Sequence, residues 1–242
     1  MKVALAQINP TVGALENNAR KIIKIISEYC SQCDLIIFPE MTLTGYPPQD
    51  LLLDDSFIQK AHNALENIAA AVKTAPVILG TIRQENYKLF NTAAVLHNSS
   101  VLTYRDKTHL PTYDVFDEVR YFTPAESISP VELNINGGTV KLGFQICEDL
   151  WDDEYDAQVS RLLCIQGAEL LINISSSPFH IYKLKERTDI ISSKAKDLKC
   201  NFIYCNLVGA QDELVFDGQS CIVNSIGEVV ALSPAFEENI QL

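Results

Sequence analysis

Three ionisable side chains stand directly after apolar segments that have the pattern of strands. Glu40 follows LIIFP, Lys107 follows VLTYRD and Cys147 follows LGFQI. In layered α/β folds, rigid strands aim the side chains at their ends into a common crevice, where sites assemble. Taken singly, each residue has an ordinary explanation as a solvated carboxylate, a solvated ammonium or a cysteine of the core. Together, the three predict one reactive site.

These residue types form a chemically complete set for attack on a carbonyl carbon. A free thiol has a pKa of about 8.5, so Cys147 needs a base or a cation before it can attack as the thiolate. The carboxylate of Glu40 can take the proton if burial or a neighbouring acid raises its pKa. The ammonium of Lys107 can stabilise the oxyanion that forms. The usual helper, a histidine, has one weak candidate near the set, His109.

The composition indicates one large domain. The chain has 242 residues, of which 47% are hydrophobic and 21% charged, so it can bury a sizeable core and is not expected to be disordered. The net charge of −12 argues against a nucleic-acid-binding surface, because phosphates require a clustered basic face. We therefore expect a single domain over residues 1–242, with no nucleic-acid partner.

The sequence carries no sign of export or of a membrane span. Its N-terminal apolar run is too short for a signal peptide and lacks a small-residue cleavage site, and no apolar stretch is long enough to cross a bilayer. The seven cysteines are therefore expected to be reduced thiols in a cytoplasmic protein. Cys30 and Cys33 form a CxxC, but there is no second pair, and no metal site is predicted.

Hydrophobic periodicity predicts strands that alternate with helices. Strands are expected at 2–8, 34–40, 76–82, 139–147, 169–175 and 200–207, and hairpins at 89–107 and 220–232. One helix is expected where Leu15, Ala19, Ile22 and Ile26 recur at helical spacing. Three further helices are expected over 55–73, 156–166 and 182–198. Residues 44–53 are expected to form an ordered loop and 108–130 a long one. Because hairpins interrupt the alternation, the pattern predicts an α/β layered domain with mixed sheets.

Three segments that hold the reactive residues resemble the signature segments of the nitrilase (carbon–nitrogen hydrolase) superfamily: FPEMTLTGYP, YRDKTHLPTYDVFDEVRYF and FQICEDLW. More narrowly, GYPPQDLL, LPTYDVFDEVRYF, CEDLW and SSSPFHIYK resemble the glutaminase domains of glutamine-dependent NAD synthetases. The resemblance runs over essentially the whole chain. It implies a four-layer α-β-β-α sandwich that pairs with further copies as a homo-oligomer.

The resemblance also implies a reaction, the hydrolysis of a linear amide through a thioester. Cys147 would attack the side-chain amide of L-glutamine and release ammonia, with Glu40 as the general base. Lys107 and the backbone N–H of Glu148 would hold the oxyanion. Glu118 falls where the family has a second glutamate that orients the lysine and the base. The alternative for Glu118 is a surface carboxylate in an acidic loop.

The resemblance also implies which residues contact the substrate, although no signature segment marks them as clearly as it marks the triad. By the family pattern, the amino and carboxylate ends of glutamine would be bound by Tyr113, Ser177 and Lys183, with Arg187 as the fallback carboxylate ligand. Phe116 and Trp151 would wall the pocket. Lys183 could equally be a solvated lysine in the first turn of a helix, and Trp151 a residue of the core.

Part of a complete NAD synthetase is absent from the chain. Those enzymes carry an ATP-using synthetase domain with an SGGxDS loop, whereas the similar strings here, at 136–138 and 217–220, lack its spacing. The chain is therefore expected to use no cofactor, since ATP and deamido-NAD would bind the absent domain. We expect an N-terminal domain of a longer enzyme, with that synthetase domain as its partner. A natural short protein is the alternative.

Three hypotheses for the function remain open at this stage. The first is a glutamine amidohydrolase that supplies ammonia for NAD synthesis. The second is a free-standing amidase of the same superfamily that acts on another small carboxamide. The third is a catalytically idle domain that serves oligomer assembly.

Overall fold

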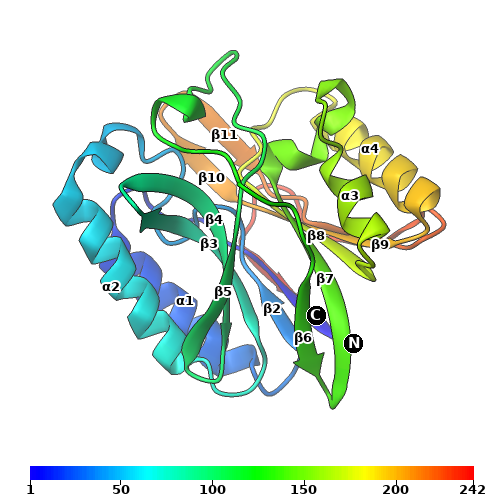
Figure 1. The fold of residues 1–242 in the computed structure, drawn as a ribbon, viewed down its shortest axis with the longest axis horizontal. Coiled ribbons are helices and arrows are strands. Elements are labelled where there is room, and N and C mark those ends of the chain that lie inside the picture. Colours follow the sequence, from blue (N-terminus) through cyan, green and yellow to red (C-terminus); the bar gives the residue numbers. More distant parts are fainter.

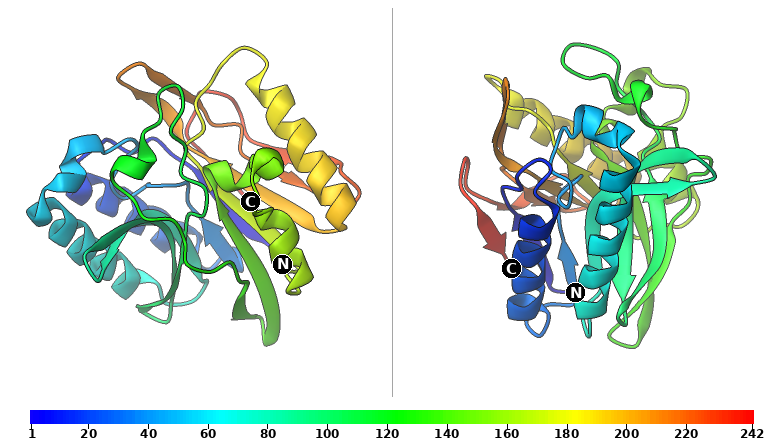
Figure 2. Two further views of the ribbon diagram at one scale, coloured as in Figure 1. Left: turned by 45° about the horizontal axis from the view of Figure 1, so that its top comes forward. Right: turned by 90° about the vertical axis from the view of Figure 1, so that its left-hand side faces the viewer.

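The computed structural model describes residues 1–242 as four layers, with two mixed β-sheets face to face and a pair of helices on the outer side of each (Figures 1 and 2). This arrangement confirms the predicted α-β-β-α sandwich. It follows from the continuous burial of central strands such as Val3–Gln7 and Leu170–Ser175, because a sheet that is buried on both faces needs a layer on either side.

The first sheet has the order β14-β1-β2-β3-β4-β5, in which β1, β2 and β3 run parallel. Its strands are β1 (Val3–Gln7), β2 (Leu35–Ile37), β3 (Val77–Glu85), β4 (Lys88–His97), β5 (Ser100–Asp106) and β14 (Asn239–Gln241). The antiparallel pairing of β14 with β1 brings the two ends of the chain together at one edge.

The second sheet has the order β13-β12-β9-β8-β7-β6, again with three parallel strands, β7, β8 and β9, at its centre. Its strands are β6 (Val131–Ile135), β7 (Gly138–Ile146), β8 (Leu170–Ser175), β9 (Asn201–Asn206), β12 (Cys221–Val223) and β13 (Val229–Leu232). A separate hairpin is formed by β10 (Val208–Gln211) and β11 (Leu214–Asp217).

Helices α1 (Leu15–Tyr29) and α2 (Asp55–Ala71) cover the first sheet, and α3 (Val159–Ile165) and α4 (Lys183–Leu198) cover the second. Short 3-10 helices lie at η1 (Gln49–Leu53), η2 (Glu118–Arg120), η3 (Cys147–Leu150) and η4 (Asp152–Glu154). The predicted spacing of α1 is confirmed, since its core face is buried as expected.

The hydrophobic core consists of three separate clusters, one for each interface between layers. In the central cluster, β7 contributes Leu142, Phe144 and Ile146, the alternating face that the sequence predicts. These side chains pack between the two sheets, so they anchor the strand that ends immediately before Cys147.

The predicted strands and helices are all present, but several of their boundaries differ, and the strand expected over 34–40 is limited to Leu35–Ile37. Residues 49–53, expected as loop, form the 3-10 helix η1. Helix α3 begins at Val159 instead of residue 156, because the carbonyl of Ala157 stays outside the helix and accepts a hydrogen bond from the ring of His109. Strands β6, β10, β11 and β14 were not predicted.

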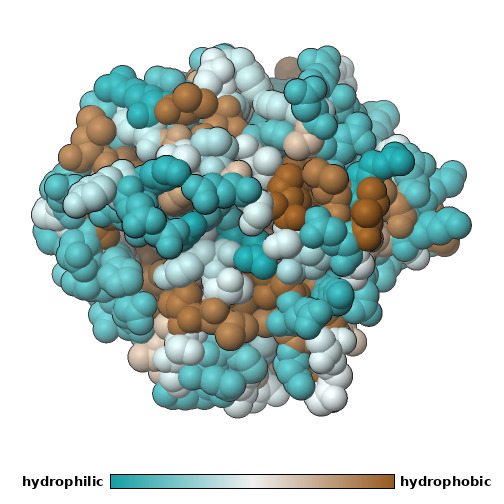
Figure 3. Space-filling view, viewed as in Figure 1, coloured by the Kyte–Doolittle hydropathy of each residue, from teal (hydrophilic) through white to brown (hydrophobic).

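None of the helices is both long enough and apolar enough to cross a membrane. On the face seen in Figure 3, polar side chains dominate the rim, and apolar ones gather in small separate groups nearer the middle.

Gly80 in β3 makes room for the segment that carries Glu40. A Cβ atom at this position would lie 2.2 Å from the carbonyl oxygen of Pro39 and 2.5 Å from Cα of Glu40. The N–H of Gly80 donates to that same carbonyl, and its own carbonyl accepts from Leu43. Only glycine therefore allows β3 to lie against this backbone.

We predict that Gly80→Ala lowers the free energy of unfolding by about 1–3 kcal/mol, because the added methyl group must push the Glu40 segment away from β3. Chemical denaturation measures the change. The matched control is Gly138→Ala in β7, where the nearest atom to an added Cβ lies 3.8 Å away. Equal effects of the two substitutions would contradict this role of Gly80.

Candidate active site

Glu40 lies just beyond the end of β2, with its side chain fully buried. Its Oε1 accepts hydrogen bonds from Nδ2 of Asn91 (2.7 Å) and Nζ of Lys107 (2.8 Å). Its Oε2 accepts from the backbone N–H of Ser176 (2.8 Å), which follows β8 of the other sheet. Both sheets therefore hold this carboxylate in one orientation.

Lys107 directly follows β5, and no part of its side chain is exposed. Its Nζ donates to Oε1 of Glu40 and to Oε1 of Glu118, each at 2.8 Å. Burial works against the charged form, but Glu118 and Glu40 more than offset it and raise the pKa of Lys107 well above its ordinary value. The ammonium is therefore a fixed positive charge in this site.

Glu118 lies in η2, within the long loop, and it is 5% exposed, so it is not a surface carboxylate. Burial raises its pKa to about 7, against the opposing effect of Lys107. The hydroxyl of Tyr46 donates to Oε1 at 3.0 Å, whereas Oε2 has no hydrogen-bond partner. The structure thus places Glu118 behind the lysine, where it can orient Nζ.

Cys147 is the first residue of η3 and has a φ of +45°. This left-handed conformation is disfavoured for a residue with a Cβ, and it turns the chain sharply off the end of β7. Burial raises the pKa of the thiol well above its ordinary value; Glu40 raises it further and Lys107 lowers it. The thiol is therefore protonated at neutral pH and needs a base to react.

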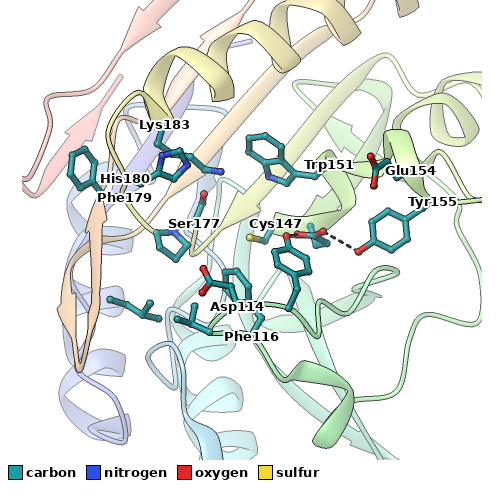
Figure 4. Close-up of a pocket in the computed structure, with 15 residues that line it drawn as sticks. Asp114, Phe116, Cys147, Trp151, Glu154, Tyr155, Ser177, Phe179, His180 and Lys183 are labelled. Carbon is teal, nitrogen blue, oxygen red and sulfur yellow. Dashed lines mark hydrogen bonds between the residues drawn. The ribbon is translucent and has the colours of Figure 1, made fainter.

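The thiol opens into a cavity of about 710 Å³, a size suited to a small molecule. The labelled side chains of Cys147, Ser177 and Lys183 converge on it from three different segments (Figure 4). All the residues that the sequence predicts for substrate binding line it: Tyr113, Phe116, Glu148, Trp151, Ser177 and Lys183. Leu214, from the hairpin β10–β11, also lines the cavity.

The carboxylate of Glu148 faces the cavity, whereas the sequence suggested a role only for its backbone N–H. Its Oε2 accepts from the hydroxyl of Tyr113 (2.8 Å), and its Oε1 accepts from the hydroxyl of Tyr155 (3.0 Å). Burial, with the nearby Glu148, raises the pKa of Tyr155 to about 12, and it also raises that of Tyr113. Both phenols therefore remain hydrogen-bond donors to this carboxylate.

Lys183 is the first residue of α4, but it is not a freely solvated lysine. Its side chain is 16% exposed, and Nζ lies 3.9 Å from the centre of the Trp151 ring, a cation–π contact. Burial and the neighbouring Arg187 lower its pKa. Trp151 combines its two predicted roles, since it packs against the outer core and also lines the cavity.

Arg187 does not reach the cavity, so its fallback role as a carboxylate ligand is wrong. The side chain is fully buried and pairs with Asp217, whose Oδ1 lies 3.1 Å from Nη2. The same Nη2 donates to Oγ of Ser177 at 3.4 Å. Because its charge is already neutralised, Arg187 supports the wall of the cavity instead of binding a ligand.

Several residues of the site were not found from the sequence. Asn91, Ser176, Tyr46 and Tyr155 supply hydrogen bonds to Glu40, Glu118 or Glu148. Tyr46 and Ser176 lie inside the motif segments GYPPQDLL and SSSPFHIYK, a signal that could have marked them. No group of three or more His, Cys, Asp or Glu side chains is arranged to hold a metal ion.

Comparison with known families decides which family the chain represents. The model of the carbon–nitrogen hydrolase family matches residues 2–242. The chain belongs to the carbon–nitrogen hydrolase family. Glutamine-dependent NAD(+) synthetases are similar to this hydrolase domain: it is 42% identical to the one from Aquifex aeolicus over 241 residues and 40% identical to the one from Thermotoga maritima over 244.

These relatives are longer than the hydrolase chain. Each match covers 99% of this chain but 41% of the relative, so the chain spans about two fifths of their length. A glutamine-dependent NAD+ synthetase from Acinetobacter baumannii, solved with ADP, superimposes with a TM-score of 0.89 at 36% identity over 99% of this chain and 44% of that one. An amidase variant from Nesterenkonia has the same fold (TM-score 0.85, 21% identity, 99% of this chain and 88% of that one).

We predict that Lys107→Met lowers the free energy of unfolding of this hydrolase domain by about 3–5 kcal/mol, because it leaves two buried carboxylates facing each other without a counter-charge. The matched control is Lys88→Met, which removes an ion pair of the same 2.8 Å length between half-exposed and exposed partners. The melting temperature of Lys88→Met should barely change, since water screens exposed ion pairs. Small and equal shifts in thermal unfolding would contradict a dry charge cluster around Lys107.

Proposed function

We propose that this chain is the glutamine amidohydrolase domain of a glutamine-dependent NAD synthetase, which hydrolyses the side-chain amide of L-glutamine and supplies the ammonia. One observation carries the proposal. The cavity beside the Cys147 thiol offers both a fixed carboxylate, Glu148, and a fixed ammonium, Lys183. This pair complements a zwitterionic amino acid, and the relatives named above support the assignment.

In the first half of the proposed reaction, Glu40 takes the proton of the Cys147 thiol as the sulfur attacks the amide carbon. The negative charge that develops on the amide oxygen is stabilised by the Lys107 ammonium and the backbone N–H of Glu148. The C–N bond then breaks, and Glu40 returns its proton to the leaving nitrogen. The products of this half are ammonia and a thioester on Cys147.

In the second half, the same carboxylate activates water. Glu40 takes a proton from the water as its oxygen attacks the thioester carbon, and the C–S bond breaks. The proton returns to the sulfur, so glutamate leaves and the Cys147 thiol is restored. Glu118 keeps Nζ of Lys107 in place through both halves without touching the reacting atoms.

The substrate would be oriented by its charged end. Its α-ammonium would lie against the carboxylate of Glu148, which Tyr113 and Tyr155 hold in place. Its α-carboxylate would meet Lys183 and the hydroxyl of Ser177, whose oxygen already accepts from Arg187. Phe116 and Trp151 would flank the apolar part of the side chain.

The proposal extends to the whole protein. Since the chain spans two fifths of its relatives, the ammonia would pass to a synthetase part of the same enzyme. That part would bind ATP and deamido-NAD, and this domain would need no cofactor. A cytoplasmic homo-oligomer fits the same proposal, and the seven unpaired cysteines are consistent with a reducing compartment.

We predict that a glutamine analogue with an electrophilic ketone in place of the amide labels Cys147, and that Glu40→Gln slows the labelling strongly because the thiol then lacks its base. Mass spectrometry locates the adduct. Glu126→Gln, at an exposed carboxylate, is the control and should label normally. An adduct on Cys164, Cys200, Cys205 or Cys221 in place of Cys147 would rule out the proposed nucleophile.

We predict that Lys183→Met raises KM for glutamine about 10–100-fold, the effect of losing one charged hydrogen bond of about 1.5–3 kcal/mol. Hydrolysis of propionamide, which has no α-carboxylate, should change little. The control is Lys185→Met, an exposed lysine of the same helix. If KM for glutamine is untouched, or propionamide is the better substrate of the unmodified protein, an amidase of different specificity is the correct assignment. If neither amide is hydrolysed, the idle-domain hypothesis holds.

A further inference from the structure

The carboxylate of Asp149 makes hydrogen bonds that the proposed reaction does not use. Asp149 is 1% exposed and does not line the cavity. Its Oδ2 accepts from the backbone N–H of Ile146 at 3.0 Å. Its Oδ1 accepts from the backbone N–H groups of Thr108 at 3.0 Å and of His109 at 2.8 Å. One buried side chain therefore receives three backbone donors.

The three backbone donors are sequence neighbours of two residues of the proposed triad. Ile146 immediately precedes Cys147, whereas Thr108 and His109 immediately follow Lys107. Asp149 thus joins two segments that lie about 40 residues apart in the sequence. It does so at the two residues whose mutual placement matters most when a sulfur attacks a carbonyl and an ammonium receives the charge.

Both segments need such support. Cys147 has a positive φ, so its turn is not the conformation that the backbone would adopt unaided. Thr108 and His109 lie past the end of β5, outside the ladder of the sheet, and their amides would be unpaired without the carboxylate. A buried donor without a partner is strongly disfavoured, so the three bonds hold both backbones in one arrangement.

We propose that Asp149 is a positioning residue that fixes the Cys147 nucleophile and the Lys107 ammonium relative to each other. The inference rests on the proposed function in one respect, that these two residues act on the same carbonyl group. Asp149 acts only through the backbone, since neither of its oxygens bonds to the triad side chains.

An asparagine cannot replace this carboxylate. Its shape is nearly the same, but it has one oxygen and one NH₂ group, which is itself a donor. Whichever way the amide is turned, the NH₂ faces a backbone N–H on one side. Asp149→Asn therefore releases either the Cys147 turn or the Lys107 segment, and a displacement of about 1 Å at a reacting centre can lower a rate about 100-fold.

The test compares Asp149→Asn with Asp152→Asn in the full-length protein. Asp152 is equally buried and lies three residues further on, but it pairs with Lys194 and not with the Lys107 segment. For Asp149→Asn we expect kcat to fall about 100-fold, with KM within about threefold of the unmodified value, because Asp149 bonds to none of the side chains proposed to bind the substrate. For Asp152→Asn we expect a lower melting temperature and nearly unchanged kcat. Unchanged kcat in Asp149→Asn, or the same loss in both variants, overturns the proposal.

Amide hydrogen exchange on the unmodified protein tests the same bonds without relying on a variant that folds. The amides of Thr108 and His109 should exchange slowly although they lie in a loop, and fast exchange would overturn the proposal. Activity on propionamide separates the two proposals. Hydrolysis of propionamide but not of glutamine would refute the proposed substrate, while a fall of kcat for propionamide in Asp149→Asn would still support the positioning role.

Discussion

A lysine ammonium held between two carboxylates, out of contact with water, is the interaction on which the rest of the site depends. Lys107 lies 2.8 Å from both Glu40 and Glu118, and none of the three is more than 6% exposed at its side chain. Removing such ions from water costs several kcal/mol each, and the cost is offset only where their remaining hydrogen bonds are made. Both oxygens of Glu40 have such bonds, whereas Oε2 of Glu118 has none.

Both sheets contribute to the hydrogen bonds of this cluster. Asn91 and Lys107 reach Glu40 from the first sheet, and the backbone of Ser176 reaches it from the second. The apolar cluster between the two sheets fixes the position of one sheet relative to the other, and so the positions of these groups. Because three hydrogen bonds hold the Glu40 carboxylate, its orientation is fixed, as the role of general base proposed for it requires.

A second group of charges, to which the proposed function assigns recognition of the substrate, is held by different means. Glu148 is fixed by two phenols, and Lys183 by the face of an indole, so both stay at the wall of the cavity without neutralising each other. Arg187 and Asp217 do neutralise each other and remain outside it. Lys183 has only a long contact with Glu186, at 3.9 Å, so its ammonium and the Glu148 carboxylate both lie at the wall of the cavity.

Much of this could be predicted from the sequence, because the decisive signals are local. Alternation in β7 and the helical spacing in α1 depend on residues a few positions apart, and they identified both elements correctly. Strand β6 alternates in the same way, so its signal was present. Strands β10, β11 and β14 have three or four residues, too few to show a period.

The sequence by itself determined the layered α/β architecture and the Glu–Lys–Cys set, since each of these is marked by a strand end or a short motif. Only the tertiary structure decided what each side chain meets. In the folded chain, Arg187 forms an ion pair outside the cavity and Glu148 lines the cavity. Asp149 accepts hydrogen bonds from both the Cys147 turn and the Lys107 segment. The physical reason is that these contacts join residues 30 to 40 positions apart in the sequence. Burial and the hydrogen-bonding needs of buried polar groups decide which residues become partners, and a local sequence pattern contains no information on either.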